Sequence, residues 1–402
     1  MLLVSRLRRQ KAWRCEKHHG ARGFRVSGIA VDTVTPRSSA KTCTVALSTS
    51  APATIQHWRA VTVDNGQKSG EKKPEKLSMM AAVRMFATEE RAEKWFIEQR
   101  WPDGIKCPHC GSENVAIVKT RKPQPFRCRT CRKHFSVRTG TPMQSSKIPL
   151  SKWALGFFLF SSHVKGISSI KLHDDLGIGQ KAAWYMGHRI REAWSKKMKR
   201  FSTTVEFDEA AIGGKEKNRH LHKKYNLGRG IAGKTILAGA KDRGTNQIKM
   251  KVIPDTGKES IHQFVHETVS KDAIIYTDEL ASYKGIPFEH HWVIHGAKEY
   301  VRDDVHTNGI ESIWALFRRM YHGTHHHMSQ KHLQRYANEC SGRLNMRGLS
   351  TVDKMTMILQ DMEGKQVGYK QLTEGGVAYP DIRNYDRPPR YLKYAGKRRQ
   401  GE

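Results

Sequence analysis

The stretch TTVEFDE at residues 203–209 decides the fold of this chain. Its β-branched and aromatic residues predict a strand at 203–207 that ends as the chain reaches Asp208. Two more short apolar runs, at 234–240 and 248–253, predict strands that are joined by a Gly-Thr-Asn turn. This part of the chain therefore starts as an antiparallel meander.

A helix and a fourth strand follow the meander. Apolar residues recur at helical spacing within 260–269, and the apolar run at 273–276 predicts a buried strand with Asp278 just past its end. This order predicts an α/β chain with a ribonuclease-H-like mixed sheet and flanking helices. In such a sheet the ends of the first and fourth strands lie side by side, so Asp208 and Asp278 can share a metal ion.

A third carboxylate comes from the helix predicted to open at the segment HTNGIE, residues 306–311. Asn308 and Glu311 are three residues apart and therefore share one helix face. The apolar stripe behind them would consist of Ile310, Ile313, Trp314 and Phe317. Glu311 is the favoured ligand because a carboxylate binds a hard cation better than an amide does, which leaves Asn308 as an auxiliary ligand. With Asp208 and Asp278, Glu311 is predicted to bind catalytic Mg²⁺ or Mn²⁺.

Each of these acids also has an ordinary structural explanation. Asp208 fits a turn at a strand end, with Glu209 as an adjacent alternative for the catalytic role. Asp278 fits a helix cap, and Glu311 fits an exposed helical position. All three together, in this order, favour a cation site over three unrelated surface acids.

The chain is strongly basic. Its 402 residues include 71 Lys and Arg against 38 Asp and Glu, which gives a formal net charge of +33. Such a field favours a polyanionic partner, and double-stranded DNA is the leading candidate. No apolar run reaches membrane-spanning length, so we expect no membrane partner and a cytoplasmic, nucleoid-associated protein.

Four of the seven cysteines form two CxxC pairs. They are Cys107, Cys110, Cys128 and Cys131. The segment between the pairs suits a short hairpin with strands at 115–118 and 125–128, preceded by a helix that begins after Thr88. Four thiolates in tetrahedral reach predict a structural zinc ion and leave no open coordination position. A redox CxxC would explain one pair but not two.

Residues 149–197 predict a helical DNA-binding unit in helix-turn-helix order. Helices are expected at 153–160, 167–176 and 180–194, with a Gly-Ile-Gly turn before the third. The residues of the third helix that are predicted to face a DNA groove are Gln180, Lys181, Tyr185, His188, Arg189 and Arg191. Further candidate DNA contacts are Lys215, Arg318 and Arg319. The alternative is a plain helical connector with a charged face.

Composition divides the chain into five parts. Residues 1–78 predict a disordered basic extension, unless the start codon is assigned too early. The helix and zinc ribbon at 88–145 and the helical unit at 149–197 precede a catalytic domain at 200–360. Residues 361–402 are expected to form a basic C-terminal tail without an assigned function.

Several motifs of this chain resemble those of a known family. The double CxxC, the segment DEAAIGGK at 208–215, TDE at 277–279 and HTNGIESIW at 306–314 are similar to motifs of bacterial insertion-sequence transposases of the DDE type, in the group with an N-terminal zinc ribbon. A later run, HHHMSQKHLQRY at 325–336, also matches. The resemblance covers roughly residues 88–359. In that family Asn or His can replace the third acid, and a lysine is usual where this chain carries Arg318.

The resemblance implies an activity. A DDE transposase hydrolyses DNA at the ends of its element and then joins the freed 3′ hydroxyl to target DNA, using two metal ions and no ATP. It would bind terminal inverted repeats and target DNA, and holding two ends implies a homodimer or a larger multimer. Two alternatives stay open. One is a non-catalytic zinc-ribbon regulator or a domesticated, inactive transposase, and the other is a nuclease that cuts without joining.

Overall fold

The computed structural model describes residues 74–195, 198–214, 233–294 and 301–374. The predicted extension at 1–78 lies outside these ranges apart from its last five residues. Within the described part of the chain, no helix is both long and apolar enough to cross a membrane.

Two capped helices open the described chain. In α1 (Met79–Met85) the hydroxyl of Ser78 accepts a hydrogen bond from the amide of Ala81, at 3.1 Å. In α2 (Glu89–Arg100) the hydroxyl of Thr88 accepts from the amide of Arg91, at 3.3 Å. The start of α2 is as predicted, whereas α1 is not predicted because it spans barely two turns.

The zinc-ribbon segment forms a small antiparallel sheet. Its strands are β1 (Val115–Ile117), β2 (Phe126–Cys128) and β3 (His134–Phe135), in the order β1-β2-β3. The first two are the predicted hairpin, and β3 is too short to leave a sequence pattern. Strands of this length need external support, and aromatic contacts of Trp101 with the rings of Phe126 and Phe135 provide part of it.

The helical unit has the predicted order. It consists of α3 (Leu150–Ser162), α4 (Ser169–Leu176) and α5 (Gln180–Arg191). Gly177 ends α4 in the left-handed region, at φ 56°, which most side chains avoid. The helix α9 (Thr351–Asp361) packs against α2 and α3 and shares their apolar core. The predicted catalytic domain, 200–360, thus includes a helix that completes the core of the preceding helical unit.

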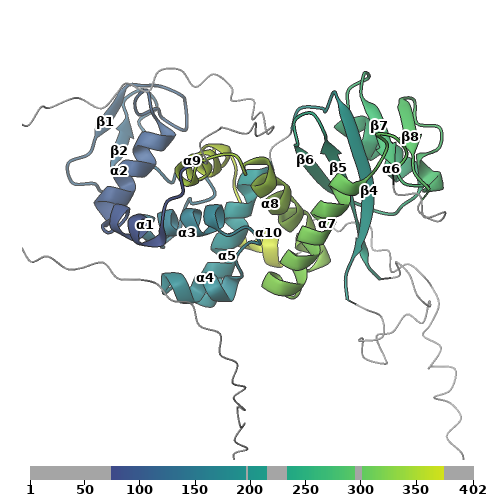
Figure 1. The fold of residues 1–402 in the computed structure, drawn as a ribbon. Coiled ribbons are helices and arrows are strands. Elements are labelled where there is room, and N and C mark those ends of the chain that lie inside the picture. The colour runs from purple at the N-terminus through teal and green to yellow at the C-terminus, as the bar shows by residue number, and fades with distance from the viewer. Residues whose placement is uncertain (1–73, 196–197, 215–232, 295–300, 375–402) are drawn as a thin grey trace, which may run out of the picture. The chain divides into compact units, whose positions relative to one another are not determined.

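The region predicted to be catalytic is built on a five-stranded mixed sheet (Figure 1). Its strands are β4 (Thr204–Ile212), β5 (Thr235–Asp242), β6 (Ile248–Ile253), β7 (Ile274–Thr277) and β8 (Glu289–Trp292). The order is β6-β5-β4-β7-β8, with antiparallel pairing on the β6 side and parallel pairing on the β8 side. The predicted ribonuclease-H-like mixed sheet is therefore confirmed, with one edge strand added.

The parallel pair at the centre of the sheet brings the two aspartates to one edge. Glu206 of β4 is the register partner of Tyr276 in β7, so Asp208 lies level with Asp278. As predicted, Asp278 follows the end of β7. The prediction that Asp208 follows the end of its own strand is wrong, because β4 continues to Ile212 alongside β5.

Helices cover both faces of this sheet. On one face α6 (Lys258–Thr268) packs on Phe207 and its apolar neighbours. The other face carries α7 (Asn308–Met320) and α8 (Leu333–Asn345) (Figure 1). The predicted apolar stripe of α7 is buried there, which fixes the helix that bears the third acid.

The segment after α7 contains a π-helical turn at Tyr321–His325, and a 3-10 turn at Gln330–His332 leads into α8. One further segment differs from the prediction. The expected basic tail begins as packed structure, because the side chain of Lys365 donates to the carbonyls of Glu192 and Ala193. The short helix α10 (Tyr369–Thr373) then buries Leu372.

Candidate active site and zinc site

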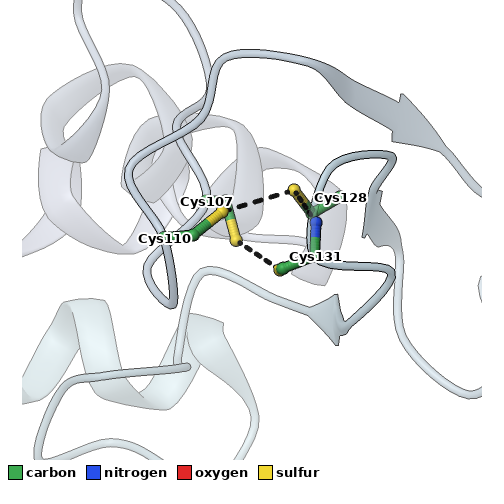
Figure 2. A group of neighbouring side chains, drawn as sticks. All are labelled: Cys107, Cys110, Cys128 and Cys131. Atoms are coloured by element: carbon green, nitrogen blue, oxygen red, sulfur yellow. Dashed lines mark hydrogen bonds between the residues drawn. The ribbon is translucent and has the colours of Figure 1, made fainter.

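The four ribbon cysteines converge on one point (Figure 2). All four Sγ atoms lie within 4.8 Å of one another, with 3.7 Å from Cys107 to Cys131 and 3.6 Å from Cys110 to Cys128. Tetrahedral coordination with Zn–S bonds of about 2.3 Å requires sulfur atoms about 3.8 Å apart. These separations therefore fit a zinc ion, and they exceed the ~2.05 Å of a disulfide bond.

The backbone of the second knuckle favours a thiolate. The amide of Cys131 donates to Sγ of Cys128 at 3.4 Å, and this hydrogen bond is the main reason that the pKa of the Cys128 thiol is lowered to about 6. Thiolates are the form that binds zinc. A four-thiolate set without an open position indicates a structural ion.

Asp208 lies on the face of β4 that α7 covers. Its Oδ2 accepts a hydrogen bond from the indole nitrogen of Trp314, at 2.9 Å, and its Oδ1 accepts from the amide of Glu209, at 2.8 Å. A carboxylate has about four acceptor positions, so both oxygens keep capacity for a cation. The two hydrogen bonds orient the carboxylate.

The electrostatics of Asp208 link it to the other two predicted acids. The pKa of Asp208 is raised to about 6, mainly by burial and also by the negative charges of Asp278 and Glu311, while its hydrogen bonds from Glu209 and Trp314 act to lower it. Asp278, after the end of β7, and Glu311, in the first turn of α7, are therefore both near enough to Asp208 to affect its ionisation. Carboxylate oxygens are the ligands that a hard divalent cation prefers.

The three carboxylates are nevertheless more spread than the cysteines. Among the described residues, the cysteine cluster alone has three or more ligand atoms all within 4.8 Å. Asp278 accepts a hydrogen bond from the amide of Leu280 at 3.1 Å, and Glu311 accepts from the hydroxyl of Thr307 at 3.4 Å. These three acids therefore do not form one compact ligand cluster of the kind that the cysteines form.

The adjacent acid, Glu209, points to the other face of the sheet. The hydroxyl of Tyr283, which lies in the core beneath α6, donates to Oε1 of Glu209. Burial raises the pKa of Glu209 to about 8. Successive strand residues face opposite sides, so only Asp208 of this pair faces the helix that carries Glu311. This geometry favours Asp208 over the alternative that the sequence leaves open.

Some predicted DNA contacts are exposed. Lys181 on α5 and Arg318 and Arg319 on α7 have accessible side chains, and Asn308 is exposed at the first position of α7. Lys215 lies outside the described residues.

Other predicted DNA contacts are corrected by the structure. His188, Arg189 and Arg191 are buried, so the prediction that they face a DNA groove is wrong. The guanidinium of Arg191 donates to the buried carboxylate of Glu339 at 2.6 Å. Arg189 stacks on the ring of Tyr185. The physical reason is that α5 packs against α8. The polar face of α5 is therefore buried as well as its apolar face.

Comparison with known proteins agrees with this architecture. A family model described as an ISXO2-like transposase domain matches residues 200–345, and one described as a transposase zinc-ribbon domain matches residues 87–134. A Halobacterium salinarum protein described as an uncharacterized protein in transposable element ISH50 is 27% identical over 257 residues, which are 60% of this chain and 85% of the relative. The chain thus carries a match to a transposase zinc-ribbon domain followed by a match to an ISXO2-like transposase domain, in agreement with its resemblance to insertion-sequence transposases.

Proposed function

We propose that this protein is an active transposase that binds the terminal inverted repeats of its element, cuts DNA there and joins the 3′ ends to target DNA. The observation that carries the proposal is that the parallel register sets Asp208 level with Asp278, while the hydrogen bond from Trp314 brings the helix whose first turn bears Glu311 to Asp208. Carboxylates from three elements that meet at one sheet edge are the ligand type that a hard divalent cation prefers.

The residues have separate roles in this proposal. Asp208 and Asp278 are held by the sheet and Glu311 by α7, and they would bind two Mg²⁺ or Mn²⁺ ions, with Asn308 as an auxiliary ligand. When bound, such ions activate the attacking water or 3′ hydroxyl and stabilise the leaving oxygen. Trp314 orients Asp208 through its 2.9 Å hydrogen bond. The exposed Arg318 is suited to bind a DNA phosphate.

DNA binding would come mainly from the ribbon and the helical unit. The ribbon carries exposed basic residues, which are Arg121, Lys122, Arg127, Arg129, Arg132 and Lys133. Together with Lys181, Lys215 and Arg319 they would contact phosphates, so affinity should fall steeply with salt. Two element ends must be held together for joining, which favours a homodimer or a larger multimer.

A strand-transfer assay tests the proposal. The purified protein is incubated with labelled DNA that carries an end of its element, an unlabelled target plasmid, and either Mg²⁺ or no divalent ion. We expect cleaved 3′ ends joined to the plasmid only with Mg²⁺. Nicked DNA without joined product would identify a nuclease, and bound but intact DNA would identify a non-catalytic regulator; either result would refute the proposal.

A further inference from the structure

Two hydrogen bonds join β4 to α7, the helix that carries Glu311. Its backbone amide at Ile310 donates to Oε2 of Glu206 at 2.8 Å, and one turn later the indole of Trp314 donates to Oδ2 of Asp208 at 2.9 Å. Two strand residues advance about 6.6 Å and four helical residues about 6.0 Å, so the two pairs align. Glu206 is therefore a second carboxylate, on the same face of β4 as Asp208, that accepts a hydrogen bond from α7.

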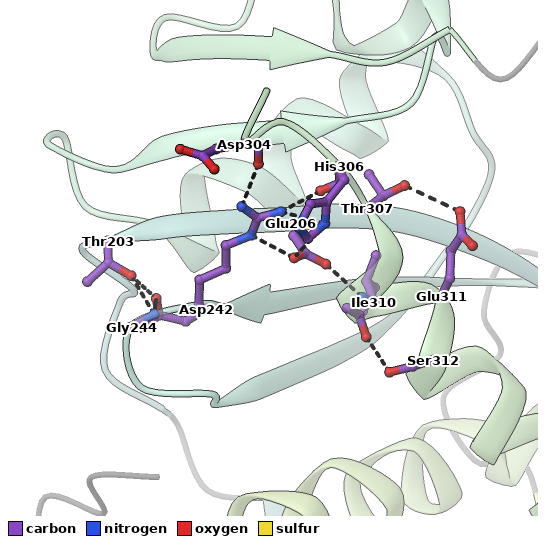
Figure 3. A network of polar contacts seen from close by, with 12 residues as sticks. Thr203, Glu206, Asp242, Gly244, Asp304, His306, Thr307, Ile310, Glu311 and Ser312 are labelled. Atoms are coloured by element: carbon purple, nitrogen blue, oxygen red, sulfur yellow. Dashed lines mark hydrogen bonds and ion pairs between the residues drawn. The ribbon is translucent and has the colours of Figure 1, made fainter. Parts of the chain in front are cut away.

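The carboxylate of Glu206 is buried and forms an ion pair with Arg243. Its side chain is 1% exposed, and its Oε1 accepts a hydrogen bond from Nε of Arg243 at 2.7 Å. The same guanidinium donates to the carbonyls of Asp304, at 2.7 Å, and His306, at 2.8 Å, in the segment that leads into α7 (Figure 3). Arg243 thus joins the sheet to the start of the helix.

The first turn of α7 depends on this acceptor. The first amides of a helix have no partner within the helix and need an external acceptor. The N-cap residue Thr307 makes no capping hydrogen bond with its side chain. The carboxylate of Glu206 accepts from Ile310 instead, and its negative charge lies at the positive end of the helix dipole.

Two glycines allow the close approach of helix and sheet. A Cβ at Gly309 would lie 2.5 Å from Oε2 of Glu206, and a Cβ at Gly239, the register partner of Asp208, would lie 2.6 Å from the ring of Trp314. A side chain at Gly239 would press on the ring of Trp314 in α7, and one at Gly309 would displace the carboxylate of Glu206.

We propose that Glu206 and Arg243 are positioning residues that set the distance of Glu311 from Asp208 and Asp278. Glu311 directly follows Ile310, whose amide donates to Glu206. A shift of this first turn would therefore move Glu311 relative to Asp208 and Asp278, which the sheet holds in place. The inference rests on the proposed function, since it concerns the geometry of the same metal site.

The test uses the full-length, zinc-loaded protein and Mn²⁺ as the probe. Mn²⁺ binding is measured by electron paramagnetic resonance, and amide hydrogen exchange is measured in the segment 306–314. For Glu206→Gln we expect exchange in this segment to rise at least tenfold and the Kd for Mn²⁺ to rise about tenfold, with exchange in the zinc ribbon unchanged. The matched control is Glu289→Gln, on the exposed edge strand β8, which should change neither quantity.

A second variant tests the same role independently, in case Glu206→Gln does not fold. Arg243→Lys keeps a positive charge beside Glu206 but loses the guanidinium that donates to the carbonyls of Asp304 and His306, so the rise in exchange and the loss of Mn²⁺ affinity should recur. Unchanged exchange and Mn²⁺ affinity in both variants would overturn the positioning role alone, provided that Asp208→Asn abolishes binding. If Mn²⁺ binding does not depend on Asp208, the proposed function fails and the positioning role fails with it.

Discussion

Replacement of Asp208 by asparagine is expected to abolish DNA cleavage while it stabilises the metal-free protein at neutral pH. Asparagine keeps the shape of the side chain and one oxygen, which can accept from the indole of Trp314 or from the amide of Glu209, but it lacks the charge that binds a divalent cation. We expect cleavage to fall at least about a thousandfold, which corresponds to about 4 kcal/mol of transition-state stabilisation. Single-turnover cleavage of labelled element-end DNA measures this loss.

The stability gain follows from the direction of the pKa shift. Burial raises the pKa of Asp208 from 3.8 to about 6, so the folded protein binds this proton more tightly than the unfolded chain does. The ionised carboxylate therefore costs stability above pH 6, and this cost disappears as the pH falls towards 4. A gap of about two pH units corresponds to at most about 3 kcal/mol.

The corresponding measurement is unfolding by urea in buffer without divalent ions at pH 8 and pH 4. Asp208→Asn should be up to about 3 kcal/mol more stable than the wild type at pH 8 and equally stable at pH 4. Asp272→Asn, at an exposed acid that precedes β7, serves as the control and should leave cleavage and stability unchanged. A loss of stability at pH 8, or retained cleavage, would show that Asp208 is an ordinary structural residue.

Replacement of Cys128 by serine is expected to release the zinc ion and unfold the ribbon. Structural zinc contributes about 10–16 kcal/mol in small zinc-binding peptides, and strands of two or three residues cannot supply this free energy themselves. We expect zinc content to fall from one ion per chain to well below half. Exchange protection of β1 to β3 should be lost, while the five-stranded sheet keeps its protection. Binding of element-end DNA should weaken at least tenfold.

Metal analysis and hydrogen exchange on the same samples separate these effects. Cys340→Ala is the matched control, because Cys340 is buried in α8, outside the ribbon, and its loss should leave the zinc content unchanged. Full zinc occupancy in Cys128→Ser, with protected ribbon strands, would contradict a four-thiolate structural site.

Features encoded locally are predictable from this sequence. The strands β4 to β7 show as short apolar or β-branched runs, and the buried stripe of α7 shows as helical spacing from Ile310 to Phe317. The cysteine spacing defines the ribbon site. In each case the signal lies within one element or between two adjacent ones, which is why sequence patterns predict it.

Features that depend on distant partners are not predictable in this way. Arg191 has the pattern of an exposed DNA contact, and only the packing of α5 on α8 brings it to Glu339, which is far along the chain. Glu206 has the pattern of an ordinary strand residue, yet its acceptor role depends on Arg243 and on the start of α7. The strand β8 has no β-branched residue, so its pairing with β7 leaves no local signal.

The most direct test of the shared metal site is anomalous diffraction from crystals of the protein grown or soaked with Mn²⁺. If Asp208 and Asp278 share a metal ion, an anomalous peak should lie between their carboxylates, with Glu311 or Asn308 as a further ligand. Mn²⁺ peaks confined to other parts of the surface, with these carboxylates free of metal at saturating Mn²⁺, would contradict the account.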